Sequence, residues 1–362
     1  MKSVRDQAPT PTLARRDALR WLGLGWTAFP MAAPPAQAVD GRWPARRIRL
    51  LVAYPPGGVS DRVARLLAEQ LSSQLAVAVF VENRPGASGS IAMDVLMRSP
   101  PDGYTLGFAA ATAVGEASRA RAETEPTRSP SCREPVTPDT AEAMSARGRS
   151  TAPQDAHPVQ RLTPVAGVMT TPVLIAGTSA LKAIDFAGML ALARQTPDAL
   201  RWATTGEGTT GHAVMEQVSH LAGIRVVHIP YKGGGQQIAD AIGGHFDLVS
   251  TNVAQPQLRA VEAGQLSALA VGAPQRVAAL PQTPTLAELG FAPANLDSLF
   301  GLFAPPRTPP EIVRRIHAAV HRALMTAPLA DSLAAMSNQA FTGSTRDFEV
   351  EIQLRGGRLP RC

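Results

Sequence analysis

The stretch AYPPGGVSDRVARLL, residues 53–67, places two prolines and two glycines directly after an apolar run and then begins a helical pattern. Residues 48–54 before it have the apolar, β-branched character of a buried strand. The apolar residues after it recur at helical spacing, as Val63, Leu66, Leu67, Leu71 and Leu75. The stretch therefore predicts a strand, a tight loop and a helix, which together form one unit of an α/β sheet.

The glycine pair in this loop has two readings. It is either a plain turn or a place where amide N–H groups face an anion, because the first amides of a helix have no acceptor within the helix and the helix dipole adds to their attraction. Ser60 or Asp61 is suited to cap the helix, and Gly58 is expected to need a positive φ. The loop by itself leaves both readings open.

Strand-like and helical segments alternate along the rest of the chain, which predicts crossover units and mainly parallel, buried sheets flanked by helices. The fold class is therefore α/β. A late helix at 311–327, behind Pro309 and Pro310, is expected to pack on the first sheet. The predicted strands are 48–54, 77–83, 104–110, 172–177, 200–206, 226–231, 246–252 and 266–273.

The length of 362 residues predicts about two domains. Residues 1–38 have the pattern of an export signal, with Arg15 and Arg16, an apolar run, and the small residues AQA at 36–38, so we expect cleavage after Ala38. Sec and Tat export both stay open. The apolar run is too short for a membrane span. A net charge of +6 without a dense basic stripe does not favour nucleic-acid binding.

No metal centre is predicted. Cys132 and Cys362 have no Cys or His neighbours at ligand spacing, and whether they pair stays open. His317 and His321 share a helix face but lack a third ligand.

A second loop, TTGEGTTGH at 204–212, again follows a strand and begins a helix, and it holds G-x-G-x-x-G as Gly206, Gly208 and Gly211. A dinucleotide site would also need an acidic residue at the end of the next strand, where Tyr231 and Lys232 stand instead. The residues favour an amide-rich loop with threonine hydroxyls, and an enzyme with a nucleotide cofactor stays as the alternative.

No catalytic set accompanies these loops. The sequence GASGS at 86–90 has Ser where a nucleophile elbow needs Gly, and there is no paired-carboxylate pattern. His212, a lone histidine, is expected to fix the loop rather than act as a base. Lys232 is either a surface lysine or a partner for an acidic ligand. The chain is predicted to bind rather than to catalyse, with no cofactor.

Four stretches, beginning WPARRIRLLVAYPPGG, VENRPGASGSIAMD, TGEGTTGHAVMEQ and LRAVEAGQLSALAVG, together resemble the periplasmic receptors of tripartite tricarboxylate transporters, the Bug family. The resemblance implies a two-lobed Venus-flytrap fold, like type II periplasmic binding proteins, with the ligand between lobes joined by two crossing strands. It divides the chain into lobe 1 at 39–114, lobe 2 at 158–264, and a return to lobe 1 at 265–362. Residues 115–157 are rich in Arg, Ser, Pro, Thr and Glu without a period of either kind, so we expect an atypical, disordered insertion there.

The resemblance also implies a site. It places one carboxylate of the ligand on the first helix start and the other on the second loop, and it adds the end of the third strand as a wall. The implied ligand-binding residues are Gly57, Gly58, Val59, Ser60, Ala110, Thr112, Thr205, Gly208, Thr209, Thr210, His212 and Tyr231.

The implied function is a monomeric periplasmic receptor for a small carboxylate, which is a dicarboxylate, an amino acid or an aromatic acid. It would deliver this ligand to a membrane permease or a signalling partner. Two departures leave a degenerate, non-functional family member as a further alternative: the segment 115–157 replaces the family's usual passage, and the C-terminal DFEVEIQLRGGRLPRC is not expected to form the final helix.

Overall fold

The strand, loop and helix at the opening stretch form as predicted in the computed structural model, which describes residues 43–113 and 162–358. Strand β1 (Ile48–Val52) leads through the loop into helix α1 (Val59–Leu75). Val63, Leu67 and Leu71 of α1 are fully buried against the sheet. The predicted signal, the segment 115–157, Cys132 and Cys362 lie outside the described residues.

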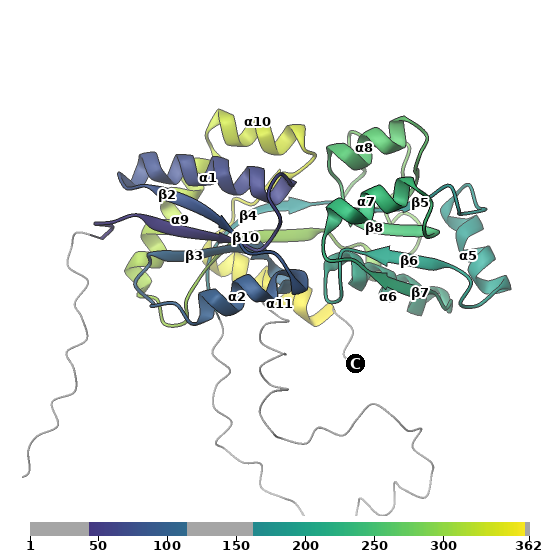
Figure 1. The fold of residues 1–362 in the computed structure, drawn as a ribbon, viewed down its shortest axis with the longest axis horizontal. Coiled ribbons are helices and arrows are strands. Elements are labelled where there is room, and N and C mark those ends of the chain that lie inside the picture. Colours follow the sequence, from purple (N-terminus) through teal and green to yellow (C-terminus); the bar gives the residue numbers. More distant parts are fainter. Residues whose placement is uncertain (1–42, 114–161, 359–362) are drawn as a thin grey trace, which may run out of the picture. The chain divides into compact units, whose positions relative to one another are not determined.

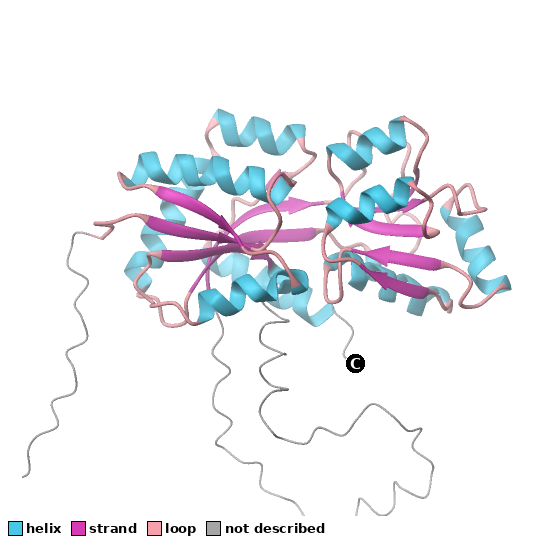
Figure 2. Cartoon of the chain, in the orientation of Figure 1, coloured by secondary structure: helices cyan, strands magenta, loops and turns pink. Residues whose placement is uncertain are grey.

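The first sheet has six strands in the order β11-β4-β10-β3-β1-β2 (Figures 1 and 2). Three helices, α1, α9 (Pro310–Leu324) and α10 (Ala327–Ala335), pack with one set of its side chains, and α2 (Ser90–Met97) and α11 (Thr345–Arg358) pack with the other. The late helix therefore covers the first sheet, as expected. The remaining strands are β2 (Val79–Asn83), β3 (Thr105–Ala110), β4 (Thr163–Thr171), β10 (Ser298–Ala304) and β11 (Gln339–Ala340).

The second sheet has five strands in the order β7-β6-β8-β5-β9. Helices α5 (Phe186–Gln195) and α6 (Thr210–Ala222) pack with one set of its side chains, and α7 (Gly234–Ile242) and α8 (Gln255–Glu262) pack with the other. The strands are β5 (Val173–Gly177), β6 (Arg201–Thr204), β7 (Val227–Pro230), β8 (Leu248–Asn252) and β9 (Ser267–Gly272).

Both sheets are mixed, whereas the sequence predicted mainly parallel ones. Strands β1, β2 and β3 pair in parallel, as do β6, β7 and β8, because helical crossovers join them. The chain passes from the first sheet to the second through β4 and β5, with only Pro172 between them, and returns through β9 and β10. Since the two passages run in opposite directions, β10 lies antiparallel to β4, and β5 lies antiparallel to β9.

These passages shift the predicted lobe boundaries. Strand β4 belongs to the first sheet, although residues 158–264 were assigned to lobe 2. Strand β9 pairs with β5 in the second sheet, so the chain returns to the first sheet after residue 272 rather than at 265. Pairing on both sides of β5, with β8 and β9, requires β9 to stay in the second sheet.

The expectation that the C-terminal segment lacks a helix is wrong. Helix α11 covers residues 345–358, and Phe348 on it is fully buried. The Phe348 ring lies over Gly301 of β10, where an added Cβ would come within 2.2 Å of the ring. The helix is therefore held by a side chain that fills the space above a glycine. None of the described helices is long and apolar enough to cross a membrane.

Candidate functional site

The first loop turns at Gly57, which has a φ of +85°. Gly58, the residue expected to need this conformation, instead has φ −76° and ψ 173° and is the N-cap of α1. An N-cap residue is extended by nature, so the left-handed turn falls one residue earlier than predicted. No side-chain hydrogen bond caps α1, although Ser60 or Asp61 was expected to do so.

Asp61 holds the loop from inside the first turn of the helix. Its buried carboxylate accepts hydrogen bonds from the Gly57 amide at 2.9 Å, from Asn83 Nδ2 at 2.8 Å and from Arg65 Nε at 3.0 Å. Asn83 Nδ2 also donates to the Tyr54 carbonyl. Burial raises the pKa of Asp61, but the hydrogen bonds from Arg65, Gly57 and Asn83 outweigh it and leave the pKa below its ordinary value. The loop is thus fixed at both ends by an ionised carboxylate network.

This network leaves the next amides available. The Gly58, Val59 and Ser60 N–H groups stand at the start of α1, where a helix offers no acceptor, and no side chain among the described residues caps them. They lie at the positive end of the helix dipole. A carboxylate could accept hydrogen bonds from them without displacing any protein group.

In the second loop, the amides of Gly208 and Thr209 are hydrogen-bonded within the loop itself. The Gly208 N–H donates to Nδ1 of His212 at 3.1 Å, and the Thr209 N–H and hydroxyl both donate to the Gly206 carbonyl. The Thr209 oxygen in turn caps α6 by accepting from the His212 N–H. His212 therefore fixes the loop, as expected from the sequence, and the Gly208 amide and the Thr209 hydroxyl are both bonded within the loop. The Thr205 side chain, which lines the cavity, remains for a ligand.

His212 is part of a pair. Its ring stacks on that of His228 with centroids 4.5 Å apart, and its Nε2 lies 3.3 Å from Glu216 Oε1. Because Nδ1 accepts from Gly208, the proton of the neutral ring is on Nε2. Burial lowers the pKa of His212 and of His228, and the neighbouring ring lowers that of His228 further. Both rings therefore favour the neutral form more than a free imidazole does, although Glu207 acts in the opposite direction on each.

A cavity of about 700 Å³ connects the two loops. Six of the predicted site residues line it: Gly57, Gly58, Val59, Ser60, Thr205 and Thr209. The other six, Ala110, Thr112, Gly208, Thr210, His212 and Tyr231, are not among the residues that line it.

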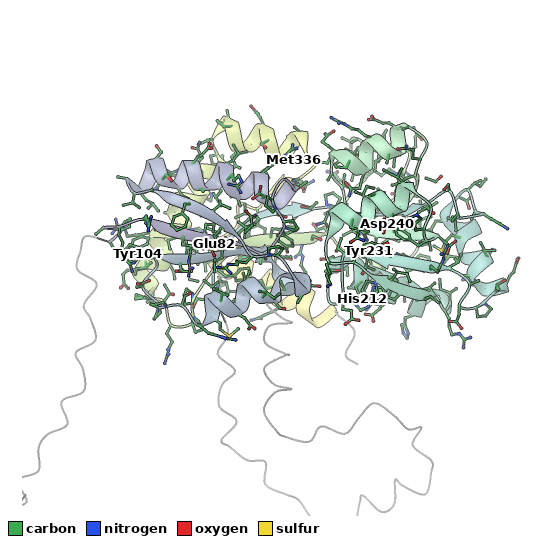
Figure 3. All side chains as sticks on the ribbon, in the orientation of Figure 1. Glu82, Tyr104, His212, Tyr231, Asp240 and Met336 are labelled. Atoms are coloured by element: carbon green, nitrogen blue, oxygen red, sulfur yellow. The ribbon has the colours of Figure 1, made fainter. Side chains whose placement is uncertain are left out.

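Internal hydrogen bonds and burial explain why some of these residues do not line the cavity. The Ala110 N–H donates to the Tyr54 hydroxyl at 2.9 Å, and burial raises the pKa of Tyr54 to about 12. The Tyr231 hydroxyl donates to Asp240 on α7 at 2.7 Å (Figure 3). Thr112 and Thr210 are buried.

The cavity also has walls that the sequence did not predict. Residues 233–236 at the start of α7 and 254–257 at the start of α8 line it, together with Gly86, Ser88 and Gly89 before α2. Lys232, for which the sequence left a surface position and a ligand contact both open, lines it as well. The glycine run at 233–235 and the proline at the start of α8 are sequence signals that could have found these two helix starts. Three helix N-terminal ends, those of α1, α7 and α8, therefore line one cavity, with the N-cap Thr209 of α6.

The charge of the lining is positive. Among its residues the charged side chains are Arg62 and Lys232, and no Asp or Glu is present. Helix N-terminal ends add partial positive charge without any side chain. Such a cavity attracts a small anion.

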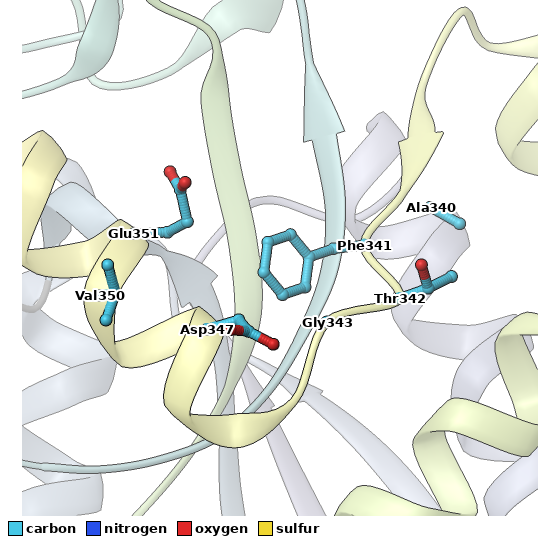
Figure 4. Close-up of a pocket in the computed structure, with 7 residues that line it drawn as sticks. All are labelled: Ala340, Phe341, Thr342, Gly343, Asp347, Val350 and Glu351. Carbon is cyan, nitrogen blue, oxygen red and sulfur yellow. The ribbon is translucent and has the colours of Figure 1, made fainter.

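A second hollow, of about 410 Å³, lies where β11 leads into α11 (Figure 4). Phe341 lines it beside Asp347 and Glu351 of α11. The two carboxylates would repel an anion, so this hollow does not suit a carboxylate ligand. No group of three or more metal-ligating side chains occurs among residues 43–113 and 162–358.

Comparison with known proteins identifies the relatives of this arrangement. The sequence model of the family described as "tripartite tricarboxylate transporter family receptor" matches residues 63–119 and 149–358 of this chain. The chain belongs to this family. Receptors of the tripartite tricarboxylate transporter family are solute-binding proteins and not enzymes, which removes the alternative of a nucleotide-cofactor enzyme.

Curated relatives match the receptor over most of their length. Protein BugT of Bordetella pertussis is 29% identical over 315 residues, which are 87% of this chain and 85% of the relative. The UPF0065 protein in the gbd 5' region of Cupriavidus necator is 29% identical over 321 residues, 89% of this chain and 88% of that protein. The resemblance to the Bug family is confirmed.

Solved structures agree with the two-lobed fold. A periplasmic transporter superposes with a TM-score of 0.70 at 28% identity, over 87% of this chain and 95% of the other. An R. palustris protein determined with adipate superposes with a TM-score of 0.69 at 26% identity, over the same shares of the two chains.

Proposed function

We propose that this receptor binds a small organic carboxylate in the periplasm and delivers it, as a monomer, to a membrane permease or a signalling partner. The candidate ligands are dicarboxylates, amino acids and aromatic acids. The observation that carries the proposal is the cavity lined by three helix starts and by no acidic side chain. The relative determined with adipate supports a carboxylate ligand.

In the proposed binding mode, one carboxylate of the ligand accepts hydrogen bonds from the free amides of Gly58, Val59 and Ser60. The Thr205 hydroxyl meets the ligand from the second loop, and Tyr54 and Phe300 line the cavity with aromatic surface. Bound ligand then stabilises closure because it makes contacts to both lobes at once.

Thermal unfolding of the chain after removal of residues 1–38 tests this proposal. The panel holds adipate, other dicarboxylates, amino acids and aromatic acids, with NAD+ for comparison. We expect at least one carboxylate to raise the melting temperature in a saturable way, with a gain of about 2.7 kcal/mol at one hundred times its dissociation constant. Stabilisation by NAD+ alone, or by nothing in the panel, would contradict the proposal.

A further inference from the structure

The lining contains two cationic side chains that no acidic side chain of residues 43–113 and 162–358 neutralises. Arg62 lies in the first turns of α1, beside the free amides, and Lys232 precedes α7 in the second lobe. Neither side chain has an ion pair or a hydrogen bond to another described residue. By contrast Arg65, Arg201 and Arg355 each pair with a carboxylate.

The acidic residues closest in sequence to these cations are not available to them. Asp61, next to Arg62, already accepts hydrogen bonds from Gly57, Arg65 and Asn83. Asp240, the acidic residue nearest in sequence to Lys232, accepts a hydrogen bond from the Tyr231 hydroxyl and lies 3.7 Å from Nδ1 of His245. The charge of the two cations therefore remains for a ligand, and a concave site focuses their field.

Much of the surface around them is apolar. Tyr54 and Phe300 line the cavity with their rings in edge contact, 5.6 Å between centroids, and Ile238 and Met336 line it as well. One positive side chain in each lobe, with apolar side chains in the same lining, matches a molecule with two charged ends and an apolar middle.

We propose that Arg62 and Lys232 are specificity-determining residues that select a doubly charged carboxylate over a singly charged one. The inference rests on the proposed function and adds to it, because hydrogen bonds from backbone amides alone do not distinguish a doubly charged ligand from a singly charged one. Arg62 strengthens the hold of α1 on one carboxylate, and Lys232 attracts the second. A monoanion engages one cation and leaves the other unpaired.

The probe is a matched pair of ligands, adipate and its monomethyl ester, whose chains have the same length and differ by one charge. Isothermal titration calorimetry would measure both on the wild type, Arg62→Gln, Lys232→Gln and the double variant. Lys182→Gln and Arg314→Gln serve as controls, because both side chains are exposed and neither lines the cavity.

We expect the wild type to bind adipate at least tenfold more tightly than the monoester, and each single variant to lose about fivefold to tenfold in adipate affinity. The double variant should bind the two ligands within about threefold of each other. The preference of the wild type should also fall as ionic strength rises.

Three results would overturn the inference while leaving the proposed function intact. These are unchanged preference in the double variant, equal loss in the Lys182→Gln and Arg314→Gln controls, and a wild type that binds only monocarboxylates. A wild type that binds no carboxylate at all contradicts the proposed function and, with it, the inference.

Discussion

The two glycine-rich loops that begin α1 and α6 share a sequence pattern but differ in what they leave free. In the first loop a buried carboxylate, Asp61, takes only the Gly57 amide, and the next three amides have no partner among the described residues. In the second loop His212 and Gly206 take the amides of Gly208 and Thr209. One loop offers backbone N–H groups to the cavity, and the other offers the Thr205 hydroxyl.

The difference lies in the chemistry of one residue near each helix start. Asp61 is two residues into α1 and reaches back to the loop with an oxygen, whereas His212 presents a ring nitrogen to the amide four residues before it. A glycine motif therefore does not by itself identify an anion site. The residue that satisfies the loop decides which amides stay available.

Removing the Asp61 carboxylate should have the largest effect. Asp61→Ala leaves Gly57, Asn83 and Arg65 without their shared acceptor, so we expect the free energy of unfolding to fall by about 2–4 kcal/mol. Carboxylate affinity should fall as well, since the first loop loses its fixed geometry. Urea denaturation and calorimetry would measure both effects.

The control for this variant is Asp331→Ala, which changes an exposed carboxylate on α10. It should alter stability by less than about 0.5 kcal/mol. Equal, small effects of the two substitutions would show that the Asp61 network does not hold the first loop.

Gly206→Ala should come next in size. Gly206 has a φ of +131°, and an added Cβ would lie 2.6 Å from the Ser88 hydroxyl oxygen, so we expect a loss of about 1–3 kcal/mol. In Gly57→Ala, the added Cβ in the first loop meets no atom within 4 Å. The free energy of unfolding should therefore fall only because of the positive φ, by about 1 kcal/mol. Chemical denaturation of both variants would give this order.

A double-mutant cycle sharpens the result. Ser88→Ala removes the atom that the new Cβ would meet, so Gly206→Ala should be less harmful in that background, with a coupling of about 0.5–1 kcal/mol. Additive losses would mean that the Ser88 contact does not constrain the second loop.

The smallest effect concerns pH. Burial lowers the pKa of His212 and His228, so the unfolded chain binds more protons than the folded one below about pH 6.5. Stability should therefore be full above that pH and should decline as the pH falls through it. In His212→Asn, whose amide oxygen can still accept from Gly208, the decline should be shallower.

Unfolding by urea between pH 5 and pH 8 would measure this slope. His220→Gln changes an exposed histidine on the same helix and should leave the slope unchanged. If His212→Asn and His220→Gln give the wild-type slope alike, the stacked pair does not couple the second loop to pH.

The sequence predicted eight of the strands and the first helix because their apolar runs and periods are regular. It missed the two-residue strand β11 and the longer strands β4 and β10, each of which carries a glycine inside the strand. The rings of Phe341 and Phe348 pack directly over Gly167 and Gly301, where a side chain would clash with them. The glycines that weaken the strand pattern in the sequence are therefore required by the packing of these rings. The same contact explains α11, whose own periodicity is weak and whose anchor, Phe348, is buried by tertiary packing.

The site was predictable in part. A glycine loop before an amphipathic helix indicated the first half, and six of the predicted residues line the cavity. The sequence could not show which amides are already bonded, because the Gly208–His212 contact depends on the rotamer of a ring. It also could not show that α7 and α8 begin at the same cavity, since that follows from strand order.

The central claim is that the free amides of the first loop bind the carboxylate of the ligand. Val59→Pro tests it by deleting one of these N–H groups at the first helical position, where proline fits, and Gly58 before it is already extended. Val59→Ala controls for the lost side chain. By calorimetry with the tightest carboxylate of the panel, we expect Val59→Pro to bind about 10–100-fold more weakly than Val59→Ala, with similar melting temperatures. Equal affinities of the two variants would contradict the claim.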